Sequence, residues 1–377
     1  MNENLLLQYN QGISKVKPIF KNGCIIYKNN NNLFDGTTIQ DILFFINNLH
    51  NKYNRLNVPI SFELGEITFK DKLTYIFLEI ICFILIKNYR HKVYVNFKVN
   101  KIIVTNGISS SPLLLLGSGR KEHIEKFIKK YEFDIYHHHY RRVLTPEDMK
   151  NEKLSIIMDD IVYFLNFFDI DSQCIDEISE VIIELIGNVS EHTFSNCLID
   201  IDIAPNYTKQ DEEGKFYGIN LVIVNFSECL FNSLIKERFS PKSSFDYERY
   251  KKVKVAYTIH KDYFGDNYTE DDFFNIVAFQ HKISGNINKN ITGGTGLTKL
   301  ICSLEKRSDA HNCYLISGER ALWFLHELLE YNQDNWIGFN KEKDFLHHPP
   351  DSDVVNYDMI FMPGTAYNLN FVMKRRY

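Results

Sequence analysis

Several features that would point to a particular environment or partner are scarce in this chain of 377 residues. Its seven cysteines are scattered, odd in number and never form a Cys-x-x-Cys pair, which argues against a disulfide framework and against a zinc site. Basic residues are not in excess, because 43 lysines and arginines stand against 48 aspartates and glutamates, for a net charge of −5. Bulk charge therefore gives no reason to expect a nucleic-acid partner.

Long hydrophobic runs are also lacking. The most apolar segment, residues 73–86, is too short to span a bilayer and contains Glu79, so we interpret it as a buried helix. The first eight residues lack the basic start and the long apolar run of a signal peptide. Together with the cysteine usage, these features predict a cytoplasmic protein with no membrane partner.

The remaining composition, 44% hydrophobic and 24% charged, is typical of a folded protein, and the length favours two domains. In residues 1–145, alternating apolar residues at 60–64 and 92–99 predict strands, and residues 38–49 and 71–87 predict helices. This α/β order resembles STAS-like domains, which are small regulatory modules. A small α/β domain without a regulatory role fits the same pattern.

Two features lie near the end of this first half. His137, His138 and His139 are consecutive and could bind a metal, but in a strand the middle side chain faces opposite to the other two. No nearby carboxylate pair completes a metal shell in the sequence, so we expect no metal there. Thr145-Pro146 is typical of a helix start, and we place a domain boundary after residue 145.

The most informative stretch is an amphipathic helix predicted over residues 171–193. At about 100° per residue, Glu184, Asn188, Glu191 and His192 fall within one arc, whereas isoleucine, leucine and valine occupy most of the opposite arc. A solvated helix face would give the same pattern. This face carries two carboxylates, an amide and an imidazole rather than lysines. Such side chains could also provide a metal ligand and a catalytic base.

A glycine-rich stretch follows later in the chain and runs into another predicted helix. It reads Asn290-Ile-Thr-Gly293-Gly294-Thr295-Gly296-Leu297. Such a loop offers backbone N–H groups and a helix N-terminus to a phosphate, although glycines also make ordinary turns. An acidic helix face followed by a glycine loop could supply a metal ligand, a base and a phosphate cradle.

Together these two motifs resemble the nucleotide site of the gyrase, histidine kinase, MutL and heat-shock chaperone (GHKL) ATPase superfamily, the Bergerat fold. In that family a helix carries Glu-x-x-x-Asn-x-x-Asp/Glu, and a later Gly-x-Gly loop opens a helix under the phosphates. Glu184, Asn188 and Glu191 match the first motif, and Gly294-Thr295-Gly296-Leu297 matches the second. The resemblance implies an α+β two-layer sandwich over residues 146–377, preceded by the smaller α/β domain.

The resemblance also implies a role for each residue. Asn188 would hold Mg²⁺ through its amide oxygen, and Glu184 would orient or deprotonate the attacking water. Residues 293–296, with Leu297 after them, would neutralise phosphate charge through backbone N–H groups. Glu191 would reach metal-bound or adenine-side water, while His192 would either meet a phosphate or cap the helix.

The adenine position departs from the family pattern, which is Asp-x-Gly-x-Gly. The aligned run here is Asn225-Phe-Ser-Glu-Cys229, without either glycine. Asn225 can still accept a hydrogen bond through its carbonyl oxygen, but it also presents an amine donor. Either the pocket binds ATP in a reshaped mode, or it binds a different nucleotide or none. We also expect a turn at Gly364-Thr365 before the last predicted strand, and a Gly-Thr turn at this place recurs in the family.

Residues 230–290 form a helical insert rich in aromatics at the position of the family's mobile ATP lid, and we expect this insert to fold and pack. Three functions remain open: an ATP-binding regulator acting as a slow ATPase or switch coupled to its N-terminal domain, a catalytically inactive scaffold module, or a serine protein kinase of the anti-sigma-factor type. The implied ligands are ATP and Mg²⁺. A protein partner is expected, and the helices before residue 193 could form a homodimer.

Overall fold

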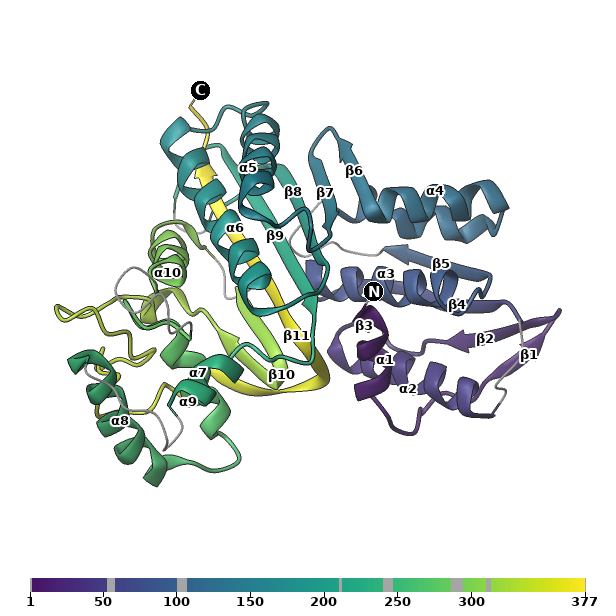
Figure 1. The fold of residues 1–377 in the computed structure, drawn as a ribbon. Helices are drawn as coiled ribbons and strands as arrows, with labels where there is room; N and C mark the ends of the chain where they lie inside the picture. The colour runs from purple at the N-terminus through teal and green to yellow at the C-terminus, as the bar shows by residue number, and fades with distance from the viewer. Residues whose placement is uncertain are drawn as a thin grey trace.

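The computed structural model describes residues 2–52, 58–99, 107–209, 212–239, 247–285, 294–309 and 313–376. Within these ranges the chain is a mixed α/β protein, as the sequence predicts, and its strands form two sheets (Figure 1).

The first sheet is organised around β4. Strands β2, β3 and β5 pair with β4 in parallel, and β1 pairs with β2 antiparallel. The predicted strands at 60–64 and 92–99 are β4 and β5, and the predicted helices at 38–49 and 71–87 are α2 and α3. The bounds are α1 (Leu5–Tyr9), β1 (Ile19–Lys21), β2 (Cys24–Lys28), β3 (Leu33–Phe34), α2 (Gly36–Lys52), β4 (Ile60–Phe69), α3 (Lys72–Lys87) and β5 (Val93–Val99).

Helix α3 is buried, as its apolar sequence predicts. Every residue from Lys72 to Ile86 is buried, which is the environment expected of a helix that is hydrophobic all round. Asp71 caps its start by accepting a hydrogen bond from the Thr74 N–H at 3.0 Å. The helix lies between the two sheets, so it belongs to the interior of the whole molecule.

The second sheet has the strand order β10-β11-β9-β8-β7-β6 in the described ranges, and every neighbouring pair is antiparallel. Its strands come from both ends of this half of the chain, because the insert separates β9 from β10. The bounds are β6 (Phe133–Tyr136), β7 (His139–Leu144), β8 (Cys197–Tyr207), β9 (Phe216–Phe226), β10 (Tyr314–Trp323) and β11 (Val355–Lys374).

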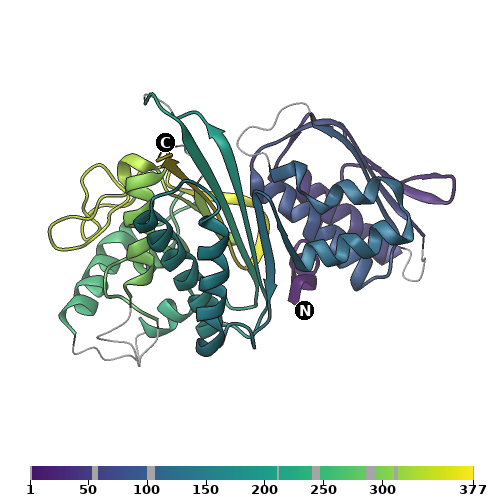
Figure 2. The same ribbon diagram turned by 90° about the horizontal axis from the view of Figure 1, so that it is seen from above.

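Helices cover both faces of this second sheet (Figure 2). On one face lie α5 (Asn151–Leu165), α6 (Ser172–His192) and α10 (Gly296–Arg307). On the other lie α3 and its neighbours from the first half, which pack against alternate residues of β8 to β11. All of β9 is therefore buried. Helices on both faces of the sheet differ from the two-layer sandwich that the resemblance implies, in which one face is covered.

A buried group of charges joins the two halves where α3 meets β8. Lys72 Nζ lies 2.6 Å from Asp200 Oδ1 and 2.5 Å from Asp202 Oδ1. Arg141 on β7 forms ion pairs with Glu79 on α3 and with Asp200. Because one carboxylate bonds groups from both halves, the first half is held to the sheet by ionic as well as apolar contacts.

The sequence predicts the boundary between the halves after residue 145. Strands β6 and β7 precede this residue, but they belong to the second sheet because β7 pairs with β8. The second sheet therefore begins at Phe133, directly after α4 (Lys121–Glu132). This pairing is between segments distant in sequence, so no local pattern reveals it. Thr145-Pro146 lies in a turn, and α5 begins only at Asn151.

Two local expectations also differ from the structure. Residues 137 and 138 form the turn between β6 and β7, where His137 has a φ of +49°, so the three histidines do not share a strand. Gly364 does not begin a turn, because β11 runs through it from Val355 to Lys374 with a φ of +95° at the glycine.

The insert after β9 folds and packs as expected. Its helices are α7 (Ser233–Arg238), α8 (Glu248–His260) and α9 (Glu270–Ala278). Tyr250, Phe273 and Phe279 are buried in the same core as α6 and α10. Arg249 lies over the Trp336 ring, 3.7 Å from its centre, which joins α8 to the loop after β10.

No helix in the described parts of the chain combines the length and the apolar character needed to cross a bilayer.

Candidate functional site

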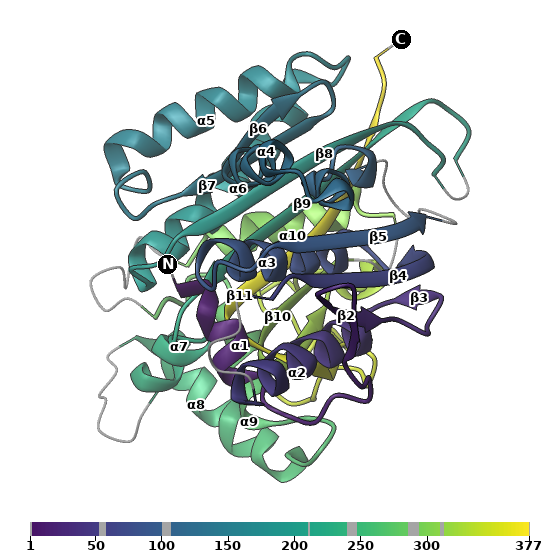
Figure 3. The ribbon, with the colours of Figure 1, turned by 90° about the vertical axis from the view of Figure 1, so that its right-hand side faces the viewer.

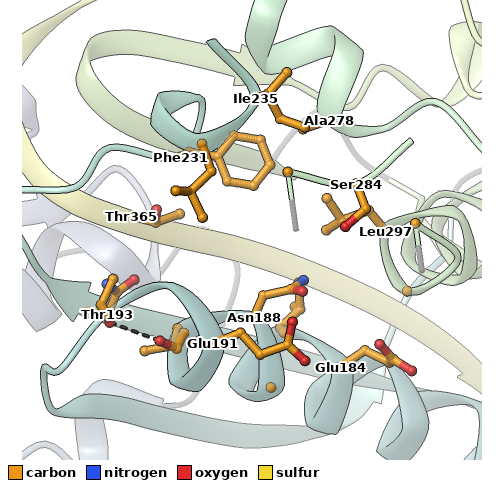
Figure 4. A pocket seen from close by; sticks show the side chains of 18 of the residues that line it. Glu184, Asn188, Glu191, Thr193, Phe231, Ile235, Ala278, Ser284, Leu297 and Thr365 are labelled. Atoms are coloured by element: carbon orange, nitrogen blue, oxygen red, sulfur yellow. Dashed lines mark hydrogen bonds between the residues drawn. The ribbon is translucent and has the colours of Figure 1, made fainter. Parts of the chain in front are cut away.

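A cavity of about 410 Å³ lies between α6, the start of α10, the end of β9 and the middle of β11 (Figure 4). Every predicted site residue that the structure describes lines it. Gly293 lies outside the described residues, and so does the side chain of His192. The predicted residues around the cavity are Glu184, Asn188, Glu191, Asn225, Gly294, Thr295, Gly296 and Leu297.

Helix α6 turns its polar residues toward the cavity, because its apolar residues pack against the sheet. Ile182, Leu185 and Ile186 are buried in the core, whereas Glu184 and Asn188 are half-buried at the cavity (Figure 4). The i, i+4 spacing of these two residues puts them one above the other. The amphipathic pattern thus predicts the orientation of this helix correctly.

The first motif residues are available to a ligand. The side chains of Glu184 and Asn188 form no hydrogen bond or ion pair with any other residue in the described ranges. A half-buried carboxylate and amide without protein partners need water, an ion or a ligand to satisfy them. Carboxylate and amide oxygens are hard ligands, so this pair suits a Mg²⁺ ion.

Helix α10 begins directly against Glu184. A Cβ atom at position 296 would collide with the Glu184 carboxylate, so Gly296 permits the close approach of loop and helix. Thr295, the residue before the helix, makes no side-chain capping bond, and the first turn contains no acidic residue. The N-terminal backbone N–H groups of a helix carry partial positive charge, so this end of the cavity favours an anion.

Gly294 packs the loop before α10 closely against the end of the insert. Its φ is +76°, which favours glycine, and a Cβ atom there would collide with the backbone of Ile283. Its carbonyl accepts a hydrogen bond from the Lys282 N–H at 2.9 Å. The end of the insert and the glycine loop are therefore tied together at the rim of the cavity.

Asn225 and Thr365 lie side by side at the inner end of the cavity. They are directly paired across β9 and β11, and both are buried. Neither side chain hydrogen-bonds to another side chain in the described part of the chain. The next residue along, Gly364, allows this pairing, because a Cβ atom there would collide with the Asn225 carbonyl. An amide and a hydroxyl here can recognise the polar edge of a ligand.

The insert supplies the opposite wall, which no motif predicts. Phe231, Ile235 and Ala278 face α6 across the cavity (Figure 4), and Ser284 lines its rim. The Phe231 ring packs 5.5 Å from Phe279, and its N–H donates to Ser317 Oγ at 2.9 Å. The only sequence signal for this wall is the place of an aromatic insert between the two motifs.

The cavity is acidic. It is lined by the carboxylates of Glu184 and Glu191, and no lysine or arginine is among its described lining residues. Lys299 on α10 instead forms an ion pair with Glu180, with Nζ 2.9 Å from Oε2. A polyphosphate in this cavity would therefore need a bound cation besides the helix N-terminus.

No group of three or more histidine, cysteine or acidic side chains in the described ranges could hold a metal ion alone. At the candidate site, a Mg²⁺ ion would complete its shell with phosphate oxygens and water, as Mg²⁺ sites commonly do. His139 lies beside two carboxylates, 3.3 Å from Asp134 Oδ2 and 3.0 Å from Asp200 Oδ2, and is part of the buried charge group instead.

Comparison of the chain with protein-family models, with curated proteins and with solved structures found no match.

Proposed function

We propose that this chain is a nucleotide-binding regulator of the GHKL type that binds ATP with Mg²⁺ in the cavity between α6 and α10. One observation carries the proposal: motif residues from α6, β9 and the start of α10, far apart in sequence, line one cavity. The volume of about 410 Å³ also lies within the range of small-molecule sites, about 300–1,000 Å³.

Each part of the cavity then has a task. Asn188 and Glu184 hold the cation side, and bound Mg²⁺ would supply the positive charge that the lining lacks. The start of α10 receives the terminal phosphates through its N–H groups. Asn225 and Thr365 receive the base at the inner end. Glu184, without a protein partner in the described ranges, orients a water for slow hydrolysis.

A structural connection supports the role of a switch. Strand β9 lines the cavity through Asn225, and its neighbours Val224 and Phe226 pack against the first half of the chain. Lys72 on α3 bonds Asp202 on β8 and also donates to the Asn220 carbonyl of β9 at 3.2 Å. Strand β9 therefore contacts both the cavity and the first half of the chain.

Isothermal titration tests the proposal. The full chain is titrated with Mg²⁺ and a non-hydrolysable ATP analogue, beside Asn188→Ala and the control Asp176→Ala, an exposed residue of α6 that does not line the cavity. We expect micromolar binding that is lost in Asn188→Ala and retained in Asp176→Ala. Absence of binding to the wild-type chain, or equal binding by all three proteins, would contradict the proposal.

A second candidate is a binding module that has lost catalysis. The specific observation is that Cys229, at the position of the family's second glycine, lines the cavity together with Leu230 and Phe231. A ring at this place narrows the room for a base. Glu184→Ala separates the candidates: an ATPase loses phosphate release in this variant, whereas a non-catalytic module shows no phosphate release above background in either protein.

A further inference from the structure

Strand β6 forms one outer edge of the second sheet. In the described ranges it is the last strand of this sheet, and its four residues are exposed or half-buried. An edge strand presents unpaired N–H and C=O groups, and folded proteins usually protect such edges with lysine, proline, a bulge or a covering segment. The β6 sequence, Phe133-Asp-Ile-Tyr136, has no lysine or proline.

The one charge on β6 does not protect the edge either. Asp134 Oδ2 lies 3.3 Å from Lys130 Nζ and 3.3 Å from His139 Nδ1, both in its own chain. These partners hold the Asp134 pKa below its ordinary value, against the effect of burial, which raises it. The charge of this carboxylate is balanced by Lys130 and His139. An approaching strand therefore meets a largely apolar edge.

Exposed apolar side chains continue from this edge onto α5 and the turn after it. Phe133, Ile135, Ile156, Tyr163 and Phe167 are each between 47% and 69% exposed. We call these five residues the β6–α5 surface. The rings of Tyr163 and Phe167 contact each other edge to face, with centres 4.9 Å apart.

The strand and helix parts of this surface adjoin. Phe133 pairs with Arg142 of β7, and Arg142 Nη1 lies 2.7 Å from Asp160 Oδ2 on α5. Asp160 is four residues after Ile156 and three before Tyr163, so the three share one side of the helix. Figures 1 and 3 both show α5 and β6 at the same end of the molecule.

We propose that the β6–α5 surface is a homodimer interface, in which β6 pairs antiparallel with β6 of a second copy and the two α5 helices pack together. A two-fold axis perpendicular to the sheet relates antiparallel edge strands and keeps both α5 helices on the same face. The one surface thus complements itself in both its strand and its helix part, which favours a second copy as the occupant.

The side chains suit this pairing. Centring the two-fold axis on Ile135 places this residue opposite its own copy, apolar against apolar. The same register sets Asp134 opposite Tyr136 of the second copy, rather than carboxylate against carboxylate. Apolar residues of the two α5 helices would then be buried in the centre of the interface, where aromatic side chains contribute most to association.

Sedimentation velocity of the full chain over a range of concentrations tests the proposal. We expect a dimer that is weakened by Ile135→Lys, which places a charge at the edge, and by the double variant Tyr163→Ser/Phe167→Ser. Each should raise the dissociation constant about tenfold or more, because aromatic and edge contacts dominate such interfaces. The control is Val255→Ser, which alters an equally exposed apolar residue of α8 at the other end of the molecule (Figure 1).

A wild-type chain that stays monomeric at tens of micromolar, or a dimer that all these variants leave intact, would overturn the proposal. Hydrogen exchange of the unmodified chain gives a second reading that does not depend on any variant folding. Amides of residues 133–136 should exchange more slowly at high protein concentration than at low. Equal exchange at both concentrations would equally count against pairing through β6. The outcome is independent of whether the cavity binds a nucleotide.

Discussion

At the scale of single residues, Gly294 and Gly296 before α10 are required to be glycine for different structural reasons. Gly294 has a positive φ and faces rigid backbone, whereas Gly296 has an ordinary conformation and faces the flexible end of the Glu184 side chain. A backbone clash cannot relax, but a side chain can turn to another rotamer. The motif alone does not separate these two roles, since both appear only as glycines in a loop.

Gly294→Ala should therefore destabilise the fold by about 1–3 kcal/mol, because alanine is strained at this φ and meets the Ile283 backbone. Gly296→Ala should change stability by about 1 kcal/mol or less, yet displace the Glu184 carboxylate and lower phosphate release. Urea unfolding and a phosphate-release assay distinguish these effects. Gly265→Ala, where a Cβ atom meets no neighbour within 4 Å, is the control. Equal losses of stability in the two loop variants would refute this distinction.

At the scale of elements, the patterns that predict correctly are local ones. Helix α6 follows from its apolar spacing and α3 from its unbroken apolar run, because each pattern reflects burial of that same segment. The cavity residues on α6 and α10 follow in turn, since the two motifs fix which faces meet. Strand β6 and the wall around Phe231 could not be predicted in this way. Their positions depend on pairing and packing with segments far away in the chain.

In strand β11 the local sequence instead predicts a feature that the structure does not have. The sequence Met362-Pro-Gly364-Thr365 favours a turn locally, yet the structure continues the strand. Strand β9 pairs with β11 from Gly364 to Lys374, and β10 pairs with it on both sides of Gly364. Position 364 requires glycine, because its φ is positive and a Cβ atom there would collide with the Asn225 carbonyl. Tertiary pairing outweighs turn propensity here, and it is this pairing that brings Thr365 to the cavity.

At the scale of the whole molecule, the buried charge group decides how the two halves respond to pH. Burial lowers the pKa of His139, but the carboxylates of Asp200 and Asp134 outweigh it and raise this pKa above its ordinary value of 6.5. Arg141, which also faces Asp200, acts in the opposite direction without reversing the shift. For Asp200, burial raises the pKa, but Arg141 and Lys72 hold it well below its ordinary value. The charged form of the group is thus favoured in the folded chain.

His139 should therefore make stability fall as pH rises from about 6.5 through its higher folded-state pKa, because the folded chain binds the proton more tightly than the unfolded chain. In His139→Gln this part of the slope should vanish, and in the control His137→Asn, at the exposed turn residue with positive φ, it should remain. Urea unfolding between pH 6 and pH 8.5 measures the slopes. Asp358, whose pKa burial raises to about 6, contributes equally to all three proteins and cancels in the comparison. If His139→Gln kept the wild-type slope, the imidazole would not be charged between the two carboxylates, and the ionic link between the halves would rest on Lys72 and Arg141 alone.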